Sequence, residues 1–109
     1  MNNSDTILLQ RILDAIEQVE SYTRGMSERE FRSRCMVQDA AIRQIEIISA
    51  AASNISLEFQ AAHSILPWSK IIGIRKKIVP ENFSVNPANI WNVIQDDLPL
   101  HKQALKKIV

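Results

Sequence analysis

Apolar residues recur at three- and four-residue intervals along most of the chain, which is the spacing of an amphipathic helix. The first such stretch begins near Ser4 or Asp5, either of which can cap a helix, and extends to about Tyr22. Gly25 follows and should end this helix. Its apolar face is expected at Ile7, Leu8, Ile12, Ala15, Ile16 and Val19.

The longest helical pattern extends from about Cys35 to Ser53. Its many alanines allow a neighbouring helix to approach closely. We therefore expect this segment to be the central helix of a bundle, with the N-terminal helix packed against it. The residues that recur on its packed face are Met36, Val37, Ala40, Ala41, Gln44, Ile45, Ile48, Ala51 and Ala52.

Capping residues and prolines mark the shorter helices. Ser27 and Glu30 have the spacing of a capping box at the start of a short helix. A further helix can begin around Ser56 and should end before Pro67, because the residue ahead of a proline disfavours the helical conformation.

The segment 68–79 has the spacing of another helix or helical turn, which Pro80 should end. Asn86 is a suitable N-cap for the last helical region, and Pro87 fits its first position. Pro99 should break or kink this region, and a C-terminal helix should follow.

These patterns, with only two glycines in 109 residues, predict an all-α protein. The length suits a single domain, residues 1–109. The N-terminal segment lacks the apolar run of a signal peptide or a membrane span, so we expect a cytoplasmic protein. Cys35 is the only cysteine, which excludes an intrachain disulfide. Neither a metal nor a cofactor is expected, because no Cys/His cluster has the spacing of zinc ligands.

Charge limits the ways in which the chain can bind nucleic acid. The formal net charge is +1, so any contact with RNA must use a local patch. Arg75, Lys76 and Lys77 form the one run of three cations. Successive helical positions fan over most of a turn, so these cations are not expected to face one ligand together. A solvated helix end, where cations complement the helix dipole, is the alternative interpretation.

Three aromatic residues, Trp68, Phe83 and Trp91, lie near the basic run in sequence. Aromatic side chains beside cations can stack on RNA bases. At this spacing they are more typical of a core or a dimer interface.

The remaining residues of chemical interest have ordinary interpretations. His63 and His101 are more typical of surface or helix-end residues than of catalysts. Cys35 is more typical of a packing residue on a helix face than of a reactive thiol. Asp96 and Asp97 point in different directions on a helix and can cap the segment ahead of Pro99.

Several short motifs carry a resemblance to a known family. They are Pro67-Trp68, Ile71-Ile72-Gly73 and Arg75, followed by Trp91 and Asp97-Leu98-Pro99. In these residues, and in the pattern of segment 39–52, the chain resembles the HepT-like family. These are small helical proteins encoded beside a minimal nucleotidyltransferase of the MNT type.

The resemblance implies an asymmetric, up-and-down helical bundle that forms a homodimer. It also implies the toxin half of a toxin–antitoxin pair, with the MNT-type nucleotidyltransferase as antitoxin. Active members resemble metal-independent ribonucleases, in which an arginine is followed after a short gap by His-any-Tyr. The arginine neutralises the scissile phosphate and the histidine moves a proton. The partner attaches adenylate groups to the tyrosine.

The chain departs from this motif at its centre. Arg75 matches the arginine, but Pro80 occupies the histidine position and Asn82 the tyrosine position. Losing a general acid or base typically lowers the rate by a factor of about 10²–10⁴. The family's Gly-Glu-Ala in the central helix is also replaced, by Ser49-Ala50-Ala51. The resemblance therefore implies a protein that cleaves RNA weakly or not at all, with Lys76 and Lys77 left to bind phosphate beside Arg75.

Two alternatives remain open from the sequence. The first is an active ribonuclease with a rearranged site, in which His63 or His101 reaches the phosphate held by Arg75. The second is a nucleotide- or substrate-binding subunit of a nucleotidyltransferase, in which Arg75, Lys76 and Lys77 hold phosphate.

Overall fold

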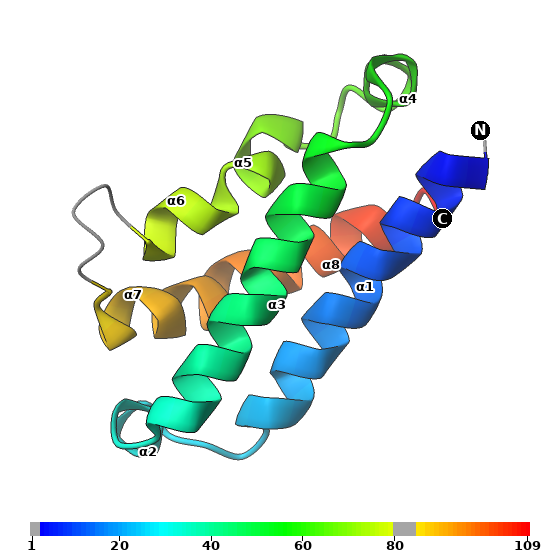
Figure 1. The fold of residues 1–109 in the computed structure, drawn as a ribbon. Helices are drawn as coiled ribbons and strands as arrows, with labels where there is room; N and C mark the ends of the chain where they lie inside the picture. The colour runs from blue at the N-terminus through cyan, green and yellow to red at the C-terminus, as the bar shows by residue number, and fades with distance from the viewer. Residues whose placement is uncertain (1–2, 80–84) are drawn as a thin grey trace.

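The computed structural model describes residues 3–79 and 85–109, and throughout these ranges the regular elements are helices (Figure 1). The expected all-α fold is confirmed. The elements in chain order are α1 (Asn3–Thr23), α2 (Glu28–Arg32), α3 (Cys35–Ser53), α4 (Leu57–Ala62), α5 (Trp68–Ile72), α6 (Ile74–Ile78), α7 (Pro87–Asn92), the π-helical turn η1 (Val93–Asp97) and α8 (Leu98–Lys106).

Helix α3 is the centre of the bundle, as its pattern predicts. Helix α1 lies antiparallel beside it, and this pair has the most extensive helix–helix contact. Helices α5 and α6 pack on another side of α3. The segment from α7 through η1 to α8 crosses the bundle and also contacts α1 (Figure 1). The fully buried side chains of α1 and α3 that form this core include Ile12, Ile16, Val19, Ala41, Ile45, Ile48 and Ala52.

The sequence pattern placed the edges of two apolar faces incorrectly. Ile7 and Met36 were expected on packed faces, but they are 60% and 87% exposed. Ile7 lies five positions before the buried Ile12, and Met36 lies five positions before the buried Ala41. Successive helical residues are rotated by about 100°, so a side chain five positions away points well away from the buried face. Cys35, expected to pack, is exposed at the first residue of α3.

Asp5 takes the position on α1 that an apolar residue would occupy. It is buried, four residues before Leu9, and so lies inside the helix instead of capping it. Its carboxylate accepts hydrogen bonds from the Ser56 backbone N–H (2.9 Å) and Oγ (2.7 Å). Ser56 is in turn the N-cap of α4, so Asp5 connects the start of α1 to the start of α4.

Local capping signals predicted several boundaries correctly. Ser27 Oγ accepts from the Glu30 N–H, and Glu30 Oε1 accepts from the Ser27 N–H, both at 3.1 Å. Gly25 has a φ of +77°, which favours glycine at the end of α1. Asn86 caps α7 by accepting from the Ala88 N–H, and Pro87 is its first residue.

The segment 68–79 forms two short helices separated at Gly73. A Cβ atom at Gly73 would lie 3.1 Å from the Ser69 carbonyl oxygen, so the residue allows a close approach of the chain to itself. Pro80, expected to end this segment, lies outside the described residues.

Pro99 does not break the last helical region. It lies near the start of α8, directly after the π turn. A proline lacks an N–H, and its ring crowds the carbonyl four residues earlier. The wider turn removes that conflict, and the Leu98 N–H donates to the Val93 carbonyl, five residues back.

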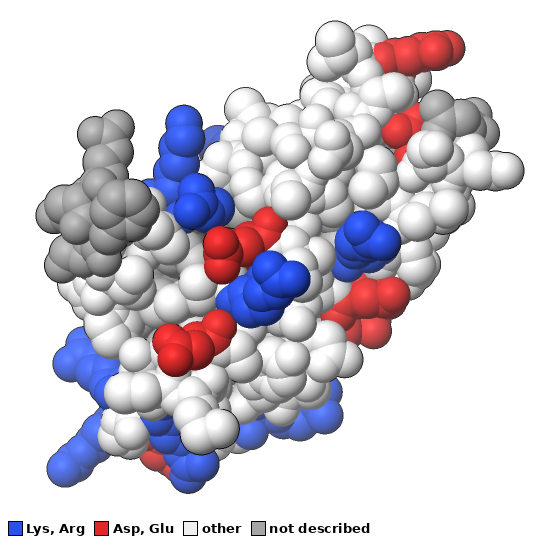
Figure 2. All heavy atoms as spheres, in the orientation of Figure 1, with Lys and Arg blue, Asp and Glu red and all other residues white. Residues whose placement is uncertain are grey.

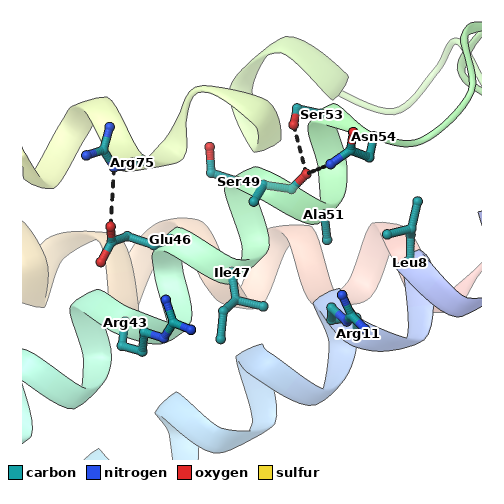
Figure 3. A pocket seen from close by; sticks show the side chains of 11 residues that line it. Leu8, Arg11, Arg43, Glu46, Ile47, Ser49, Ala51, Ser53, Asn54 and Arg75 are labelled. Carbon is teal, nitrogen blue, oxygen red and sulfur yellow. Dashed lines mark hydrogen bonds and ion pairs between the residues drawn. The ribbon is translucent and has the colours of Figure 1, made fainter.

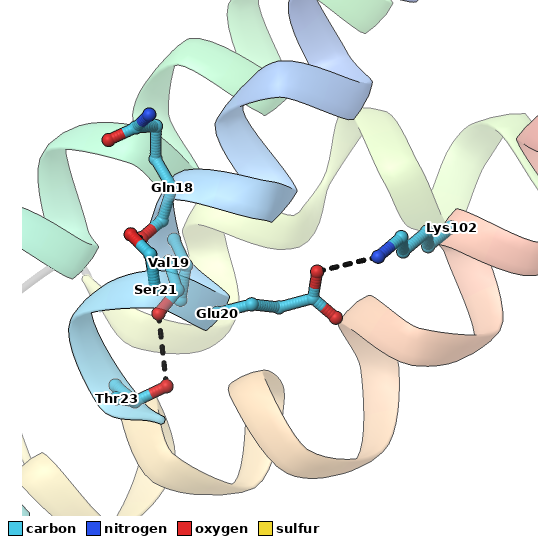
Figure 4. Close-up of polar contacts among 6 residues, drawn as sticks. All are labelled: Gln18, Val19, Glu20, Ser21, Thr23 and Lys102. Atoms are coloured by element: carbon cyan, nitrogen blue, oxygen red, sulfur yellow. Dashed lines mark hydrogen bonds and ion pairs between the residues drawn. The ribbon is translucent and has the colours of Figure 1, made fainter. Parts of the chain in front are cut away.

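Helix α8 is attached to α1 by an ion pair. Lys102 Nζ lies 2.7 Å from Glu20 Oε1 (Figure 4).

Along residues 3–79 and 85–109, no helix has the length and apolarity needed to cross a bilayer.

Candidate functional site

The three successive cations of α6 lie in different surroundings. Arg75 Nε is 3.6 Å from Glu46 Oε2 on α3, whereas Lys77 Nζ is 2.8 Å from Asp97 Oδ2 on η1. Residues two apart on a helix are separated by about 200°, so their side chains leave α6 on opposite sides. Lys76 lies between them and is exposed. The structure therefore does not bring the three cations to one ligand.

Arg75 lines a hollow of about 480 Å³ with two arginines from distant parts of the sequence. Arg11 comes from α1 and Arg43 from α3, and Glu46 is the acidic residue in the lining (Figure 3). We call this hollow, with its three guanidinium groups, the arginine groove. Among the described lining residues, three arginines and one glutamate give an excess of positive charge.

The ion pair of Arg75 is weak enough to exchange. Both partners are substantially exposed, 50% for Arg75 and 39% for Glu46. Exposed pairs of this kind contribute about 0–1 kcal/mol to stability. A phosphate oxygen could therefore replace Glu46 at small cost, because a guanidinium binds phosphate through two parallel hydrogen bonds.

The segment Ser49-Ala50-Ala51 also lines the arginine groove. Ala50, at the position where the resemblance places glutamate, is exposed there. Its methyl group adds no carboxylate to the groove at this position. Ser49 Oγ donates to the Ile72 carbonyl and so connects α3 to the end of α5.

A second hollow lies on the Lys77 side of α6. It measures about 260 Å³ and is lined by Pro67, Lys70, Lys77, Asp97, Leu100 and His101. We call it the π-turn hollow, because Asp97 belongs to η1 and His101 follows it on α8.

His101 is buried, which corrects its interpretation as a surface or helix-end residue. It is 7% exposed, and its Nδ1 has no hydrogen-bond partner within the described part of the chain. Burial lowers its pKa, Asp97 opposes that effect, and Lys77 and Lys70 add to it. The imidazole is therefore neutral at neutral pH. His63, by contrast, is a helix-end residue as predicted. It is the C-cap of α4, and its ring centroid lies 4.5 Å from that of Phe59.

The structure does not place a histidine in the arginine groove within the described ranges. His101 lines the other hollow, and Arg75 is not among the charges that shift its pKa. Asp97 does not cap α8 through its side chain, as the sequence suggested, because its carboxylate pairs with Lys77.

Two of the three aromatic residues near the basic run are used in packing. Trp68 is buried, and its Nε1 donates to the His63 carbonyl at 3.0 Å. Trp91 is partly buried, with its ring centroid 5.4 Å from that of Phe31. Phe83 lies outside the described residues, as do Pro80 and Asn82.

Sequence reasoning missed Arg11 and Arg43 as members of the candidate site. They lie more than 30 residues before Arg75, and no local motif marks them. Both are polar positions on helices whose buried faces were predicted, so they only come together once α1, α3 and α6 are packed. Among the described residues, no group of three or more His, Cys, Asp or Glu side chains could hold a metal ion.

Comparison with known proteins agrees with the resemblance. The chain is 32% identical over 108 residues to a protein of Thermococcus cleftensis named "Probable ribonuclease HepT", covering 99% of this chain and 98% of that protein. It is 34% identical over 101 residues to a "Putative RNase" of Caldanaerobacter subterraneus, covering 93% and 90%.

A longer relative matches over the whole chain. The protein named "Gamma-glutamylcyclotransferase and putative RNase" from Methanocaldococcus jannaschii is 34% identical over 109 residues, and the chain spans 49% of its length. No solved structure matches the chain significantly. The sequence profile of the family described as "Ribonuclease HepT-like" matches residues 12–108, and the chain belongs to this family.

Proposed function

We propose that this HepT-like protein binds RNA through the arginine groove and cleaves it weakly or not at all. We further propose that it is the toxin-family member of a toxin–antitoxin pair, a cytoplasmic homodimer whose partner is an MNT-type nucleotidyltransferase. One observation carries the proposal. Arg75, the motif arginine, lies in a groove with Arg11 and Arg43, while the chain continues into Pro80 and Asn82 where the motif needs histidine and tyrosine.

The chemistry of RNA cleavage separates binding from catalysis at this site. Guanidinium groups can hold the phosphodiester and offset its charge, and three arginines line one hollow. Cleavage also needs a group that removes the proton of the attacking 2′-hydroxyl. Proline has no group that can accept a proton, and the groove has no histidine among its described lining residues. RNA can therefore be held at the groove without an effective route for proton transfer.

The same substitution bears on the proposed regulation by the partner. Asn82 has no phenol to adenylylate. Tyr22 is the only tyrosine, and its hydroxyl lies on α1, where it accepts a hydrogen bond from Gln44 at 3.4 Å. We expect the nucleotidyltransferase to bind this chain without modifying it at the motif. Co-purification of the two proteins, with intact-mass measurement after incubation with ATP, tests both parts.

The face formed by α1 and α3 is suited to a homodimer. A hollow of about 650 Å³ adjoins the arginine groove and shares Arg11, Arg43 and Ile47 with it. The dimer interface is proposed on the part of this hollow outside the groove, which includes the exposed Ile7 and the acidic Asp14 and leaves Arg11 and Arg43 to RNA. Figure 2 shows basic and acidic side chains alternating beside a wide uncharged area on this view of the molecule. A two-fold interface must be self-complementary, and a surface with apolar residues and both signs of charge meets that requirement.

A matched pair of variants tests the homodimer. Ile7→Glu places a carboxylate on the proposed interface, whereas Met36→Glu makes the same kind of change at an exposed residue outside both hollows. Sedimentation equilibrium should show a dimer for the wild type and for Met36→Glu, and a monomer for Ile7→Glu. Equal behaviour of the two variants would exclude this face.

RNA binding is tested by fluorescence anisotropy with single-stranded RNA at fixed salt. Arg75→Gln should weaken binding by about tenfold, the effect of losing one charge-assisted contact. Lys76→Gln is the control, because it makes the same charge change at the adjacent residue, which lines neither hollow. Equal effects of the two substitutions would show that RNA responds to the net charge of α6 and does not use the groove.

A further inference from the structure

The π-turn hollow is a second cluster of charged groups, separate from the arginine groove. The two hollows have no described lining residue in common. Arg75 lines one and Lys77 the other, and the two side chains leave α6 on opposite sides. Four elements contribute its polar groups: Lys70 from α5, Lys77 from α6, Asp97 from η1 and His101 from α8. The proposed function uses none of them.

His101 is the group in this hollow that calls for an explanation. A neutral imidazole has one N–H donor and one acceptor nitrogen, and buried polar atoms are normally paired. His101 is more than nine-tenths buried, its Nδ1 has no hydrogen-bond partner among the described residues, and it lines the hollow with Lys70 and Lys77. A leucine would fill the position without leaving a polar atom unpaired.

The charges around His101 favour an anion. Lys70 and Lys77 are both close enough to disfavour its protonated form, and Asp97 is the acidic residue that faces it. The Asp97 carboxylate already forms an ion pair with Lys77, with Oδ2 2.8 Å from Nζ. The lining residues that the structure describes therefore include two cations, one carboxylate and the imidazole.

The local backbone is also unusual at this point. The π turn, a rare element that occurs frequently at functional sites, ends at Asp97. Asp97 and Lys77 also line an adjoining hollow of about 270 Å³ beside η1, so their ion pair lies between two surface cavities. An anion entering either cavity can compete with Asp97 for Lys77.

We propose that the π-turn hollow binds a phosphate group, held by the ammonium groups of Lys70 and Lys77 and by an N–H of His101. Asp97 holds Lys77 in place while the site is empty and competes with the phosphate for it. The site is independent of the arginine groove, so it remains whether or not Arg75 binds RNA.

Histidine-ring NMR on the full chain tests this proposal directly. The chain has two histidines, so His63, at the end of α4, serves as an internal control. Inorganic phosphate, titrated at constant ionic strength and pH, should shift the ring signals of His101 with saturation and leave those of His63 in place. The pKa of His101 should rise in saturating phosphate, because a nearby anion favours the protonated form.

Four substitutions of charged residues distinguish a built site from general attraction. Lys70→Gln and Lys77→Gln should each weaken the phosphate affinity seen at His101 by about tenfold, whereas Lys76→Gln should leave it unchanged. Asp97→Asn should tighten binding, because it removes the competitor for Lys77. His101 signals that stay in place, or equal weakening by Lys76→Gln and Lys77→Gln, would overturn the proposal.

The source of the phosphate is resolved by two further probes. A nucleoside 5′-monophosphate carries a terminal phosphate, and a dinucleoside monophosphate without terminal phosphates carries only the diester of an RNA backbone. A saturable His101 shift with the diester assigns the site to RNA. A shift with the monophosphate alone assigns it to a nucleotide. If neither probe shifts the His101 signals, or if inorganic phosphate does not, the proposal is contradicted. The result for Arg75→Gln in the RNA-binding experiment does not depend on this outcome.

Discussion

Arg75 and Glu46 form an ion pair 29 positions apart in sequence, with Arg75 Nε 3.6 Å from Glu46 Oε2. The pair connects α6 to the central helix at the edge of the arginine groove. It keeps the motif arginine near the place where RNA is proposed to bind. Because the two atoms are far apart for an ion pair and both side chains are exposed, the pair contributes little to stability. Glu46 therefore acts mainly as a competitor of the phosphate for Arg75.

Removing this competitor should strengthen RNA binding. Glu46→Gln leaves the shape of the groove and frees Arg75, so we expect tighter binding to single-stranded RNA, by about threefold to tenfold. The free energy of unfolding should change by less than about 1 kcal/mol. Fluorescence anisotropy and urea denaturation measure the two quantities.

Glu58→Gln is the control for that experiment, because it removes the same charge from an exposed position on α4. If Glu58→Gln tightens binding as much as Glu46→Gln, the effect comes from net charge, and the local role of Glu46 is excluded.

The arginines that join Arg75 in the groove should contribute separately to RNA binding. Replacing Arg11 or Arg43 by glutamine should weaken binding by about tenfold and reduce the slope of log affinity against log salt by about 0.7, the value for one phosphate contact on a single strand. Anisotropy titrations at several salt concentrations measure the slope. Lys106→Gln, at an exposed position near the end of α8, should leave it unchanged. Unchanged slopes for both arginine variants would show that Arg11 on α1 and Arg43 on α3 do not contact RNA.

His101 should make the stability of the fold depend on pH. Its pKa in the folded chain lies below the ordinary value of about 6.5, so the unfolded chain binds its proton more readily. The contribution of the neutral ring is fully present above that ordinary value and is lost as pH falls through the lower, folded value. Urea denaturation of the wild type should therefore show a decrease in the free energy of unfolding between pH 7 and pH 5.

His101→Leu separates this effect from the titration of carboxylates. The variant has no ionisable group at the position and no unpaired Nδ1, so we expect it to be more stable than the wild type by about 1–3 kcal/mol at pH 7. The difference in stability between the two proteins should widen as pH falls. A constant difference from pH 7 to pH 5 would mean that the histidine does not titrate with a lowered pKa.

Asp5 should be a major determinant of stability despite its polar character. Asp5→Ala leaves the N–H of Ser56 without its carboxylate partner and removes the connection between α1 and α4. A loss of about 2–3 kcal/mol in the free energy of unfolding is expected for a buried, charge-assisted network. Glu17→Ala, at an exposed position of α1 that lines neither the groove nor the proposed dimer interface, should cost less than about 1 kcal/mol. Similar losses for both would show that helix propensity, and not the buried contact, governs the effect.

The parts of the fold that depend on neighbouring residues in sequence could be predicted well. The capping box at Ser27, the N-cap at Asn86 and the central position of α3 follow from local hydrogen bonding and from apolar spacing. Pro99 shows the limit of such rules, because a π turn accommodates it and the helical region continues.

Features that depend on tertiary packing could not be predicted from local patterns. The burial of Asp5 requires Ser56, 51 residues later, and the arginine groove requires three helices to meet. His101 has no distinguishing neighbour in sequence, and its surroundings become apparent only where residues of α5, α6, η1 and α8 line the π-turn hollow together. Arg75 was identified because a motif marks it, whereas Arg11 and Arg43 have no such mark.

The most direct test of the account restores the two missing motif residues and measures RNA cleavage. Under identical conditions, the variant with Pro80→His and Asn82→Tyr should cleave single-stranded RNA at least about 10²-fold faster than the wild type, the usual contribution of a general acid or base. Adding Arg75→Ala to that variant should abolish the gain. A wild type that already cleaves RNA as fast as the restored variant would contradict the claim that this chain retains the binding site and lacks the group for proton transfer.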